Sequence, residues 1–170
     1  MEFLKNYGLL LLAVVIECVI FQVLAQYRER PAFLSYNSFV NVLNQSAVYG
    51  VLSVGMTFVI LTGGIDLSVG SLIAFGGVLC AMVVRAGVGA GGGVVWGWIF
   101  LGWSVALVAG LGSGLVAGML VSTVRIPPFI ATLALMSSVR GLGYILASGK
   151  PIAPLPEAYT FLGRHWIAGR

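Results

Sequence analysis

A short polar break, Gly63–Gly70, separates two of the longest apolar stretches of the sequence. The stretch before it, Ser46–Leu61, and the stretch after it, Ser71–Val84, contain no charged residue. With a few neighbouring residues, each stretch reaches the length of about 20 residues that crosses a bilayer as an α-helix. Asp66 lies inside the break. Because a carboxylate is costly in hydrocarbon, Asp66 must lie at the membrane interface, line a water-filled cavity, or be paired.

The residues of the break also indicate how the chain turns. Gly63 and Gly64 can adopt the positive φ that ends a helix. Asp66 or Ser68 can then accept hydrogen bonds from the unpaired N–H groups at the start of the next helix. We therefore expect Asp66 at a helix N-terminus, with its carboxylate within hydrogen-bonding distance of backbone N–H groups two or three residues further on.

The composition extends this interpretation to the whole chain. Of its 170 residues, 59% are hydrophobic and only 8% are charged, which is too few polar residues to cover a soluble domain. The predicted fold class is therefore all-α, a polytopic helical membrane protein. The net charge of +4 comes from cations scattered singly among apolar stretches, so it does not indicate nucleic-acid binding. Cys18 and Cys80 fall inside apolar stretches and are expected to be buried free thiols.

About five membrane-spanning helices are expected from the lengths of the apolar runs. Residues 26–45 are polar and predict a loop, with a short interfacial helix near Phe39–Leu43. Residues 86–93, which are nearly all Gly and Ala, predict a flexible connector. A cleaved signal peptide is the alternative for the first run, although Glu17 inside it argues against this. The predicted spans are Tyr7–Ala25, Ser46–Leu61, Leu67–Val84, a part of Val94–Val124, and Phe129–Ala147.

The fourth span carries a small residue at every fourth position. On a helix this spacing forms one stripe, against which another helix can pack closely. Static packing is the favoured interpretation, and a moving contact in a transporter is the alternative. The stripe, which we expect to face another helix and not lipid, consists of Gly102, Ala106, Gly110, Gly114 and Gly118.

Two further charges lie within predicted spans, Glu17 in the first and Arg140 in the fifth. If both helices run in the same direction, the two residues lie at similar depths, roughly 15–18 Å from the helix starts. We expect Arg140 to be buried in the bundle and paired, with Glu17 as the leading partner. The alternatives for Arg140 are backbone carbonyl partners or a place along a polar substrate pathway.

No catalytic, nucleotide-binding or metal-binding pattern is found. Ser148-Gly149-Lys150-Pro151 lacks the upstream glycine and the Ser or Thr of a phosphate-binding loop. His165 is the only histidine, and a catalytic or metal-binding histidine needs companions. The chain is therefore not expected to be an enzyme, to bind ATP or to hold a metal or other cofactor.

Two blocks of the sequence resemble the permease subunits of ribose-type ABC sugar importers. The similarity extends over about residues 34–157 and includes the Asn-rich segment Phe39–Gln45. The first block contains Thr62, Gly63, Gly64, Asp66 and Ser68, and the resemblance makes these residues and Arg140 candidates for the substrate pathway or a structural motif. The blocks are Gly55–Ser71 and Arg125–Leu133, the latter followed by Met136, Arg140-Gly141 and Gly149–Ile152.

The resemblance implies a transmembrane subunit in the bacterial inner membrane that forms the translocation pathway for a monosaccharide such as ribose. A second permease subunit, identical or different, would complete the pathway by alternating access. Two cytoplasmic ABC ATPase subunits would bind the ATP, and a periplasmic or lipid-anchored binding protein would deliver the sugar. Lipid would surround the helices, and no nucleic acid is expected.

The chain departs from such permeases in its length, because they continue through a second half that contacts the ATPase. Residues 1–170 are therefore expected to form a single transmembrane permease domain that corresponds to an N-terminal half. The resemblance implies a cytoplasmic N-terminus, whereas the distribution of Lys and Arg favours the opposite orientation. The alternative functions are an ABC permease for a nucleoside or a branched-chain amino acid, and a truncated membrane fragment that does not transport.

Overall fold

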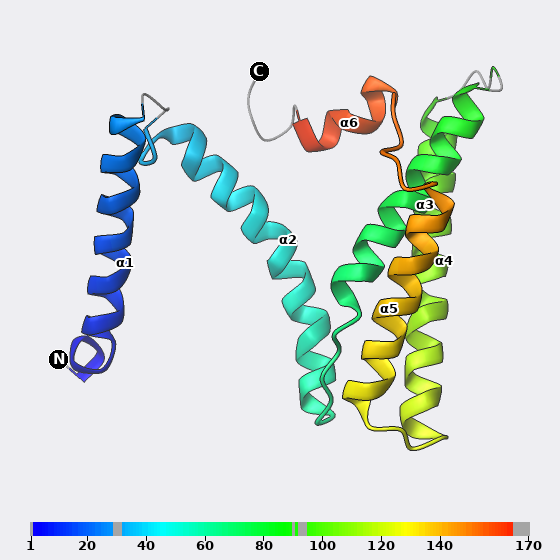
Figure 1. Ribbon diagram of the computed structural model, residues 1–170, viewed down its shortest axis with the longest axis horizontal. Helices are drawn as coiled ribbons and strands as arrows, with labels where there is room; N and C mark the ends of the chain where they lie inside the picture. Colours follow the sequence, from blue (N-terminus) through cyan, green and yellow to red (C-terminus); the bar gives the residue numbers. More distant parts are fainter. Residues whose placement is uncertain (1, 29–31, 90, 92–94, 165–170) are drawn as a thin grey trace. The chain divides into compact units, whose positions relative to one another are not determined.

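The computed structural model describes residues 2–28, 32–89, 91 and 95–164; His165 lies outside the described residues. The described residues form helices and no strands, and five helices are long and apolar enough to cross a membrane, as predicted. Figure 1 shows their order along the chain. The helices are α1 (Glu2–Tyr27), α2 (Tyr36–Leu61), α3 (Val69–Gly89), α4 (Val95–Ser122), α5 (Pro128–Leu146) and α6 (Glu157–Arg164).

The chain divides into two compact units, and the first, Met1–Tyr49, holds α1 and the beginning of α2. The segment before α2 is fixed to the end of α1 by two contacts. The backbone N–H of Leu34 donates to the Gln22 Oε1 atom at 2.8 Å. The rings of Phe21 and Phe33 stack with their centroids 5.5 Å apart.

The predicted loop over residues 26–45 is wrong for its second half, because α2 already begins at Tyr36. Ser35 explains the early start: its Oγ atom accepts a hydrogen bond from the Ser38 N–H at 3.3 Å, as an N-cap residue does. The residues between Tyr36 and Tyr49 include no glycine or proline, so nothing interrupts the helix once it is capped.

The second unit, Gly50–Arg170, contains the bundle of α3, α4 and α5. These three helices lie side by side in Figure 1. Its core is small and consists of Cys80, Val84 and Ile99, against which Ala158 and Tyr159 also pack. The amphipathic helix α6, which carries the latter two residues, therefore covers one end of the bundle.

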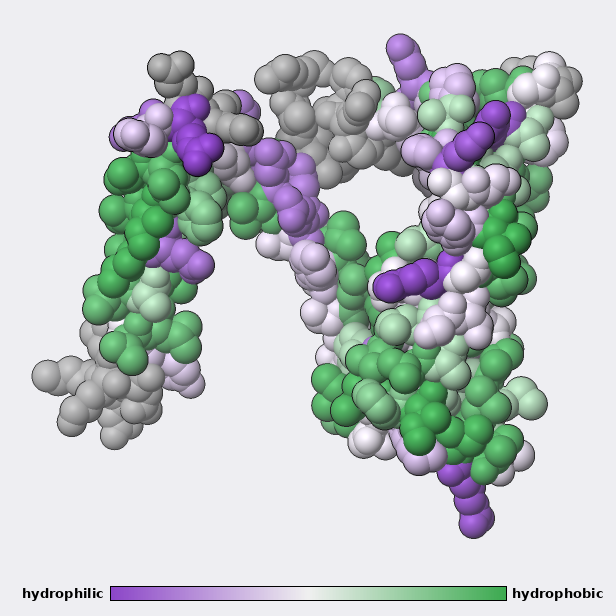
Figure 2. Space-filling view, viewed as in Figure 1, coloured by the Kyte–Doolittle hydropathy of each residue, from purple (hydrophilic) through white to green (hydrophobic). Residues whose placement is uncertain are grey.

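The outer surface of the bundle is apolar. Leu107 and Leu111 of α4 are 68% exposed and Leu115 is 67% exposed, so this face of α4 has no cover within the described chain. Figure 2 shows hydrophobic residues over much of the visible helix surface, with hydrophilic residues mostly toward the helix ends. An apolar exterior of this extent is stable in lipid and not in water.

The small-residue stripe of α4 packs on α3 over its first part only. Gly102 is buried, and a Cβ atom on it would lie 2.8 Å from Cys80 Sγ and 3.0 Å from Cys80 O. Ala106 Cβ lies 3.5 Å from the position of a Cβ on Gly76. At the other three positions, no atom of another described element lies within 4 Å of such a Cβ. The packing of another helix on them therefore stays a prediction; they are Gly110, Gly114 and Gly118.

Helix α3 continues to Gly89, so the predicted flexible connector is wrong for residues 86–89. The ring of Trp98 lies directly on Gly87, in the space that a Cβ atom would occupy. Glycine is therefore required here for close packing of α4 on α3, and the packing offsets the poor helix propensity of glycine.

Candidate functional site

The turn after α2 has the geometry that its two glycines predict. Gly63 has a φ of 73°, and its N–H donates to Ile60 O at 2.9 Å. The N–H of Gly64 donates to Val59 O at 3.0 Å. This pair of bonds around a left-handed residue is a Schellman motif, which satisfies the last carbonyls of α2. Thr62 adds a third bond there, from its Oγ1 to Val59 O at 2.8 Å.

Asp66 and Ser68 organise the start of α3. Asp66 Oδ1 accepts hydrogen bonds from the Ser68 N–H at 2.7 Å and from the Ser68 hydroxyl at 2.6 Å. Ser68 is fully buried and directly precedes α3, and its carbonyl accepts the first helical hydrogen bond from Leu72 N at 2.9 Å. The Asp66 carboxylate thus lies within bonding distance of a backbone N–H two residues on, as expected, but this N–H belongs to Ser68, and Ser68 instead of Asp66 directly precedes the helix.

Thr132 joins the two sequence blocks that carry the family resemblance. Its hydroxyl lies 3.1 Å from Ile65 O, in the α2–α3 segment, and 2.9 Å from Pro128 O, in its own helix. One hydroxyl proton is shared between these acceptors. The side chain is only 5% exposed, so water cannot replace the bond. The sequence alone did not predict this role for Thr132.

The segment between α2 and α3 runs beside the first half of α5. Gly64 packs against Pro128, where a Cβ on the glycine would lie 3.6 Å from Pro128 Cβ. Further along, Phe75 Cδ2 lies 3.4 Å from the position of a Cβ on Gly143. At 1.5 Å per residue, α3 therefore begins roughly 14 Å along α5, which is itself roughly 28 Å long. The first turn of α3 thus lies near the middle of a membrane-spanning helix.

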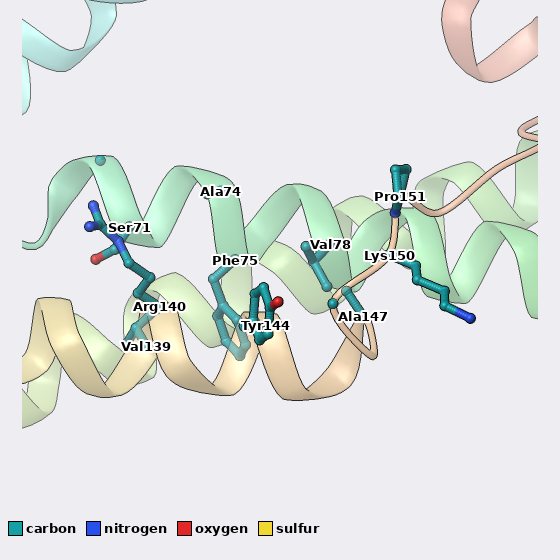
Figure 3. A pocket seen from close by; sticks show the side chains of 13 residues that line it. Ser71, Ala74, Phe75, Val78, Val139, Arg140, Tyr144, Ala147, Lys150 and Pro151 are labelled. Atoms are coloured by element: carbon teal, nitrogen blue, oxygen red, sulfur yellow. The ribbon is translucent and has the colours of Figure 1, made fainter.

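A cavity of about 420 Å³ opens between α3 and α5 at this level. Figure 3 shows its lining side chains, among them Arg140 beside Ser71 and the rings of Phe75 and Tyr144. Lys150, from the loop after α5, lines it as well. The cavity therefore combines two cations, two hydroxyl groups and two aromatic rings with apolar walls.

The expected burial of Arg140 in the bundle is wrong within the described chain: Arg140 is exposed on this cavity, because Val139 and Gly143 occupy the α5 positions that are buried against the bundle. Glu17 is exposed on α1 and belongs to the other unit, so the predicted pairing of the two residues stays a prediction. In the part of the chain that the structure describes, no group of three His, Cys, Asp or Glu residues could hold a metal ion.

The five long apolar helices define a multi-pass membrane protein with a cavity between α3 and α5. A family model described as branched-chain amino acid transport system / permease component matches residues 38–151. The chain therefore belongs to this family of transporter permease components. The matched segment contains the whole of the first sequence block and nearly all of the second, including Thr132 and Arg140.

The curated relatives are permease proteins of bacterial importers. The ribose import permease protein of Escherichia coli (strain K12) is 39% identical over 122 residues, which cover 72% of this chain and 35% of the relative. The ribose import permease protein of Bacillus subtilis (strain 168) is 38% identical, over 82% of this chain and 41% of the relative. The xylose transport system permease protein of Escherichia coli (strain K12) is 33% identical, over 96% and 40%.

The chain thus spans about two fifths or less of the length of these relatives. No solved structure is significantly similar to the chain. The resemblance to sugar-type ABC permeases is confirmed by these relatives, and with five apolar helices the chain is a multi-pass protein of the bacterial inner membrane.

Proposed function

We propose that the protein is the transmembrane subunit of an ATP-driven ABC importer for a monosaccharide, such as ribose or a related sugar. The supporting observation is the similarity to permease proteins named for ribose and xylose, over the segment that forms the α2–α3 turn and the α3–α5 cavity. The subunit itself needs no cofactor in this proposal, because the ATP is bound by a partner.

The proposed assembly has three kinds of partner. A second permease subunit, identical or different, completes the translocation pathway, and cytoplasmic ABC ATPase subunits supply the energy. A periplasmic or lipid-anchored sugar-binding protein delivers the substrate. Arg140 lines the pathway, while the motif residues hold the break between α2 and α3 rigid: Thr62, Gly63, Gly64, Asp66 and Ser68.

The proposal is tested by disrupting the coding region in its own host and measuring uptake of labelled ribose, xylose and galactose. We expect ATP-dependent uptake of one of these sugars to be lost and to return when the intact locus is restored. Unchanged uptake of all monosaccharides tested would contradict the proposal.

A permease for another small polar solute is the second candidate, because the matching family is described by its branched-chain amino acid members. Uptake measurements in the same strains distinguish the sugar permease from this second candidate. Loss of labelled leucine or nucleoside uptake, with sugar uptake intact, would favour the second candidate.

A further inference from the structure

A second cavity, of about 570 Å³, continues the first along α3, with Leu146 at the end of α5 and the loop that follows it as the opposite wall. The two cavities share Ala147, Lys150 and Pro151, so they adjoin where α5 ends. Both volumes fall within the roughly 300–1,000 Å³ that is typical of small-molecule sites. Together they form one groove, which we call the α3–α5 groove.

The α3–α5 groove extends along the whole of α3. Its lining residues on this helix run from Gly70 to Gly89 at spacings that keep them on one helical face. These 19 steps correspond to roughly 29 Å at 1.5 Å per residue. The hydrocarbon core of a bilayer is about 30 Å thick, so the groove has the length of a passage across it.

Cations line the groove at three places along its length. Arg140 lies in the first cavity, Lys150 lies where the two cavities meet, and Arg85 lies in the second. The described lining residues include no Asp or Glu, and Asp66 in the preceding turn lines neither cavity. A cleft lined by one sign of charge concentrates solutes of the opposite sign and repels those of its own.

The neighbourhood of Arg140 suits a polyhydroxylated solute. A guanidinium group presents several N–H donors to hydroxyl oxygens, and the exposed Tyr144 hydroxyl can donate and accept hydrogen bonds. The Ser71 hydroxyl is buried and already donates to Ser68 O at 2.8 Å. The half-buried ring of Phe75 offers an apolar surface to the C–H face of a sugar ring. A few convergent polar groups on an otherwise apolar wall are typical of sites that bind small polar ligands.

We propose, on the basis of the function proposed above, that the α3–α5 groove is a water-filled and positively charged part of the sugar pathway. It admits uncharged or anionic polyhydroxylated solutes, binds them beside Arg140, and excludes cationic ones. A covering apolar helix is the competing occupant. It would bury three cations without a carboxylate among the lining residues, which is costly in the membrane.

The test uses single cysteines in the full protein, in its native membranes, with Cys18 and Cys80 replaced by Ala. Ala74→Cys lies in the groove, whereas Ile73→Cys lies at the adjacent position, which is also exposed but lines neither cavity. Each variant is treated with two thiol reagents of similar size, an anionic sulfonatoethyl and a cationic trimethylammonium-ethyl methanethiosulfonate.

We expect the Ala74→Cys thiol to react with both reagents and to favour the anionic one. One positive charge at about 6 Å in water changes each rate roughly threefold in opposite directions, so the ratio of the rates shifts roughly tenfold. Adding Arg140→Gln should remove most of this preference. Ile73→Cys, which faces lipid, should react slowly with both reagents, and the transported sugar should slow the reaction at Ala74→Cys only.

Protection of Ala74→Cys from both reagents would overturn the proposal in favour of a covering helix, and equal rates would overturn the charge selectivity. The thiol labelling does not depend on transport. It therefore tests whether the groove is water-filled separately from whether the protein imports a sugar. In a transporting strain, Ala74→Trp should lower uptake at least tenfold while Ile73→Trp leaves it unchanged. Equal uptake by the two Trp variants would also contradict a passage through the groove.

Discussion

Replacing Gly102 with alanine tests the close packing of α4 on α3. The added Cβ would lie 2.8 Å from Cys80 Sγ, 3.0 Å from Cys80 O and 3.3 Å from Cys80 Cα. Two of these three atoms belong to the backbone, so the helices themselves must separate to relieve the contact. Overpacking of this kind costs about 1–3 kcal/mol.

Gly112→Ala is the matched control, because it lies on the same helix and no atom of another described element is within 4 Å of its added Cβ. The gain in helix propensity, about 1 kcal/mol, is common to both substitutions and cancels in their difference. Gly102→Ala should therefore unfold about 1–3 kcal/mol more easily than Gly112→Ala. The assay is denaturation by SDS in mixed micelles, followed by the fluorescence of the four tryptophans.

A double substitution identifies the atom responsible. Cys80→Ala removes Sγ, the nearest atom, and leaves the two backbone contacts. The double variant Cys80→Ala/Gly102→Ala should lose roughly 0.5–3 kcal/mol less of the free energy of unfolding than the two single variants lose in sum. Equal stability of Gly102→Ala and Gly112→Ala would refute the packing argument.

Three other predictions concern the α2–α3 break and the uncovered part of α4. Thr132→Val leaves Ile65 O without its buried donor and should lower the free energy of unfolding by about 1–3 kcal/mol, whereas Thr132→Ser should restore most of it. Asp66→Ala removes the acceptor of two hydrogen bonds from Ser68 and should lower the free energy of unfolding by about 1–3 kcal/mol, whereas Asp66→Asn should cost less, because its amide oxygen can still accept from Ser68. Equal losses, measured by the same denaturation, would argue against a stabilising role of these bonds. Gly114→Leu should leave the unfolding of this chain unchanged but weaken co-purification with helices outside it, if the stripe packs there.

The local features of the break could be predicted from the sequence because their causes are local. Gly63 is free to adopt a positive φ. The backbone N–H that donates to Asp66 belongs to Ser68, only two residues further along the chain. The same reasoning missed the early start of α2, although Ser35 followed by Ser38 was a readable N-cap signal. The asparagines at positions 37, 41 and 44 suggested a loop, but no residue between Tyr36 and Tyr49 breaks a helix.

The groove could not be predicted, because it depends on how far α3 is shifted along α5. That shift is set by contacts between residues far apart in sequence, such as the bond from Thr132 to Ile65, 67 positions away. Helical periodicity reports which face of a helix is apolar but not its register against a neighbour. Arg140 was recognised as an unusual charge, whereas the roles of Phe75 and Tyr144 followed only from the packed structure.

The last prediction concerns α6 and the protonation of Tyr159, which lies outside the membrane-spanning helices. Burial, together with the neighbouring Cys80 thiol, raises the pKa of Tyr159 from 10.0 to about 12. A pKa that is higher in the docked state means that docking favours the neutral phenol. The stabilisation of the docked helix is therefore complete below pH 10 and is lost as the pH rises through about 12.

Because this stabilisation is lost at high pH, we expect α6 to detach from the bundle in alkali and Cys80 to become accessible. Tyr159→Phe should remove a transition near pH 12 from the tyrosinate absorbance. The phenylalanine keeps the ring against the core cluster of Cys80, Val84 and Ile99 and cannot ionise, so α6 should stay docked at high pH. Labelling of Cys80 by an uncharged maleimide should then rise between pH 10 and 12 more steeply in the natural protein than in Tyr159→Phe. The same pH dependence in both would show that ionisation of Tyr159 does not control the docking of α6.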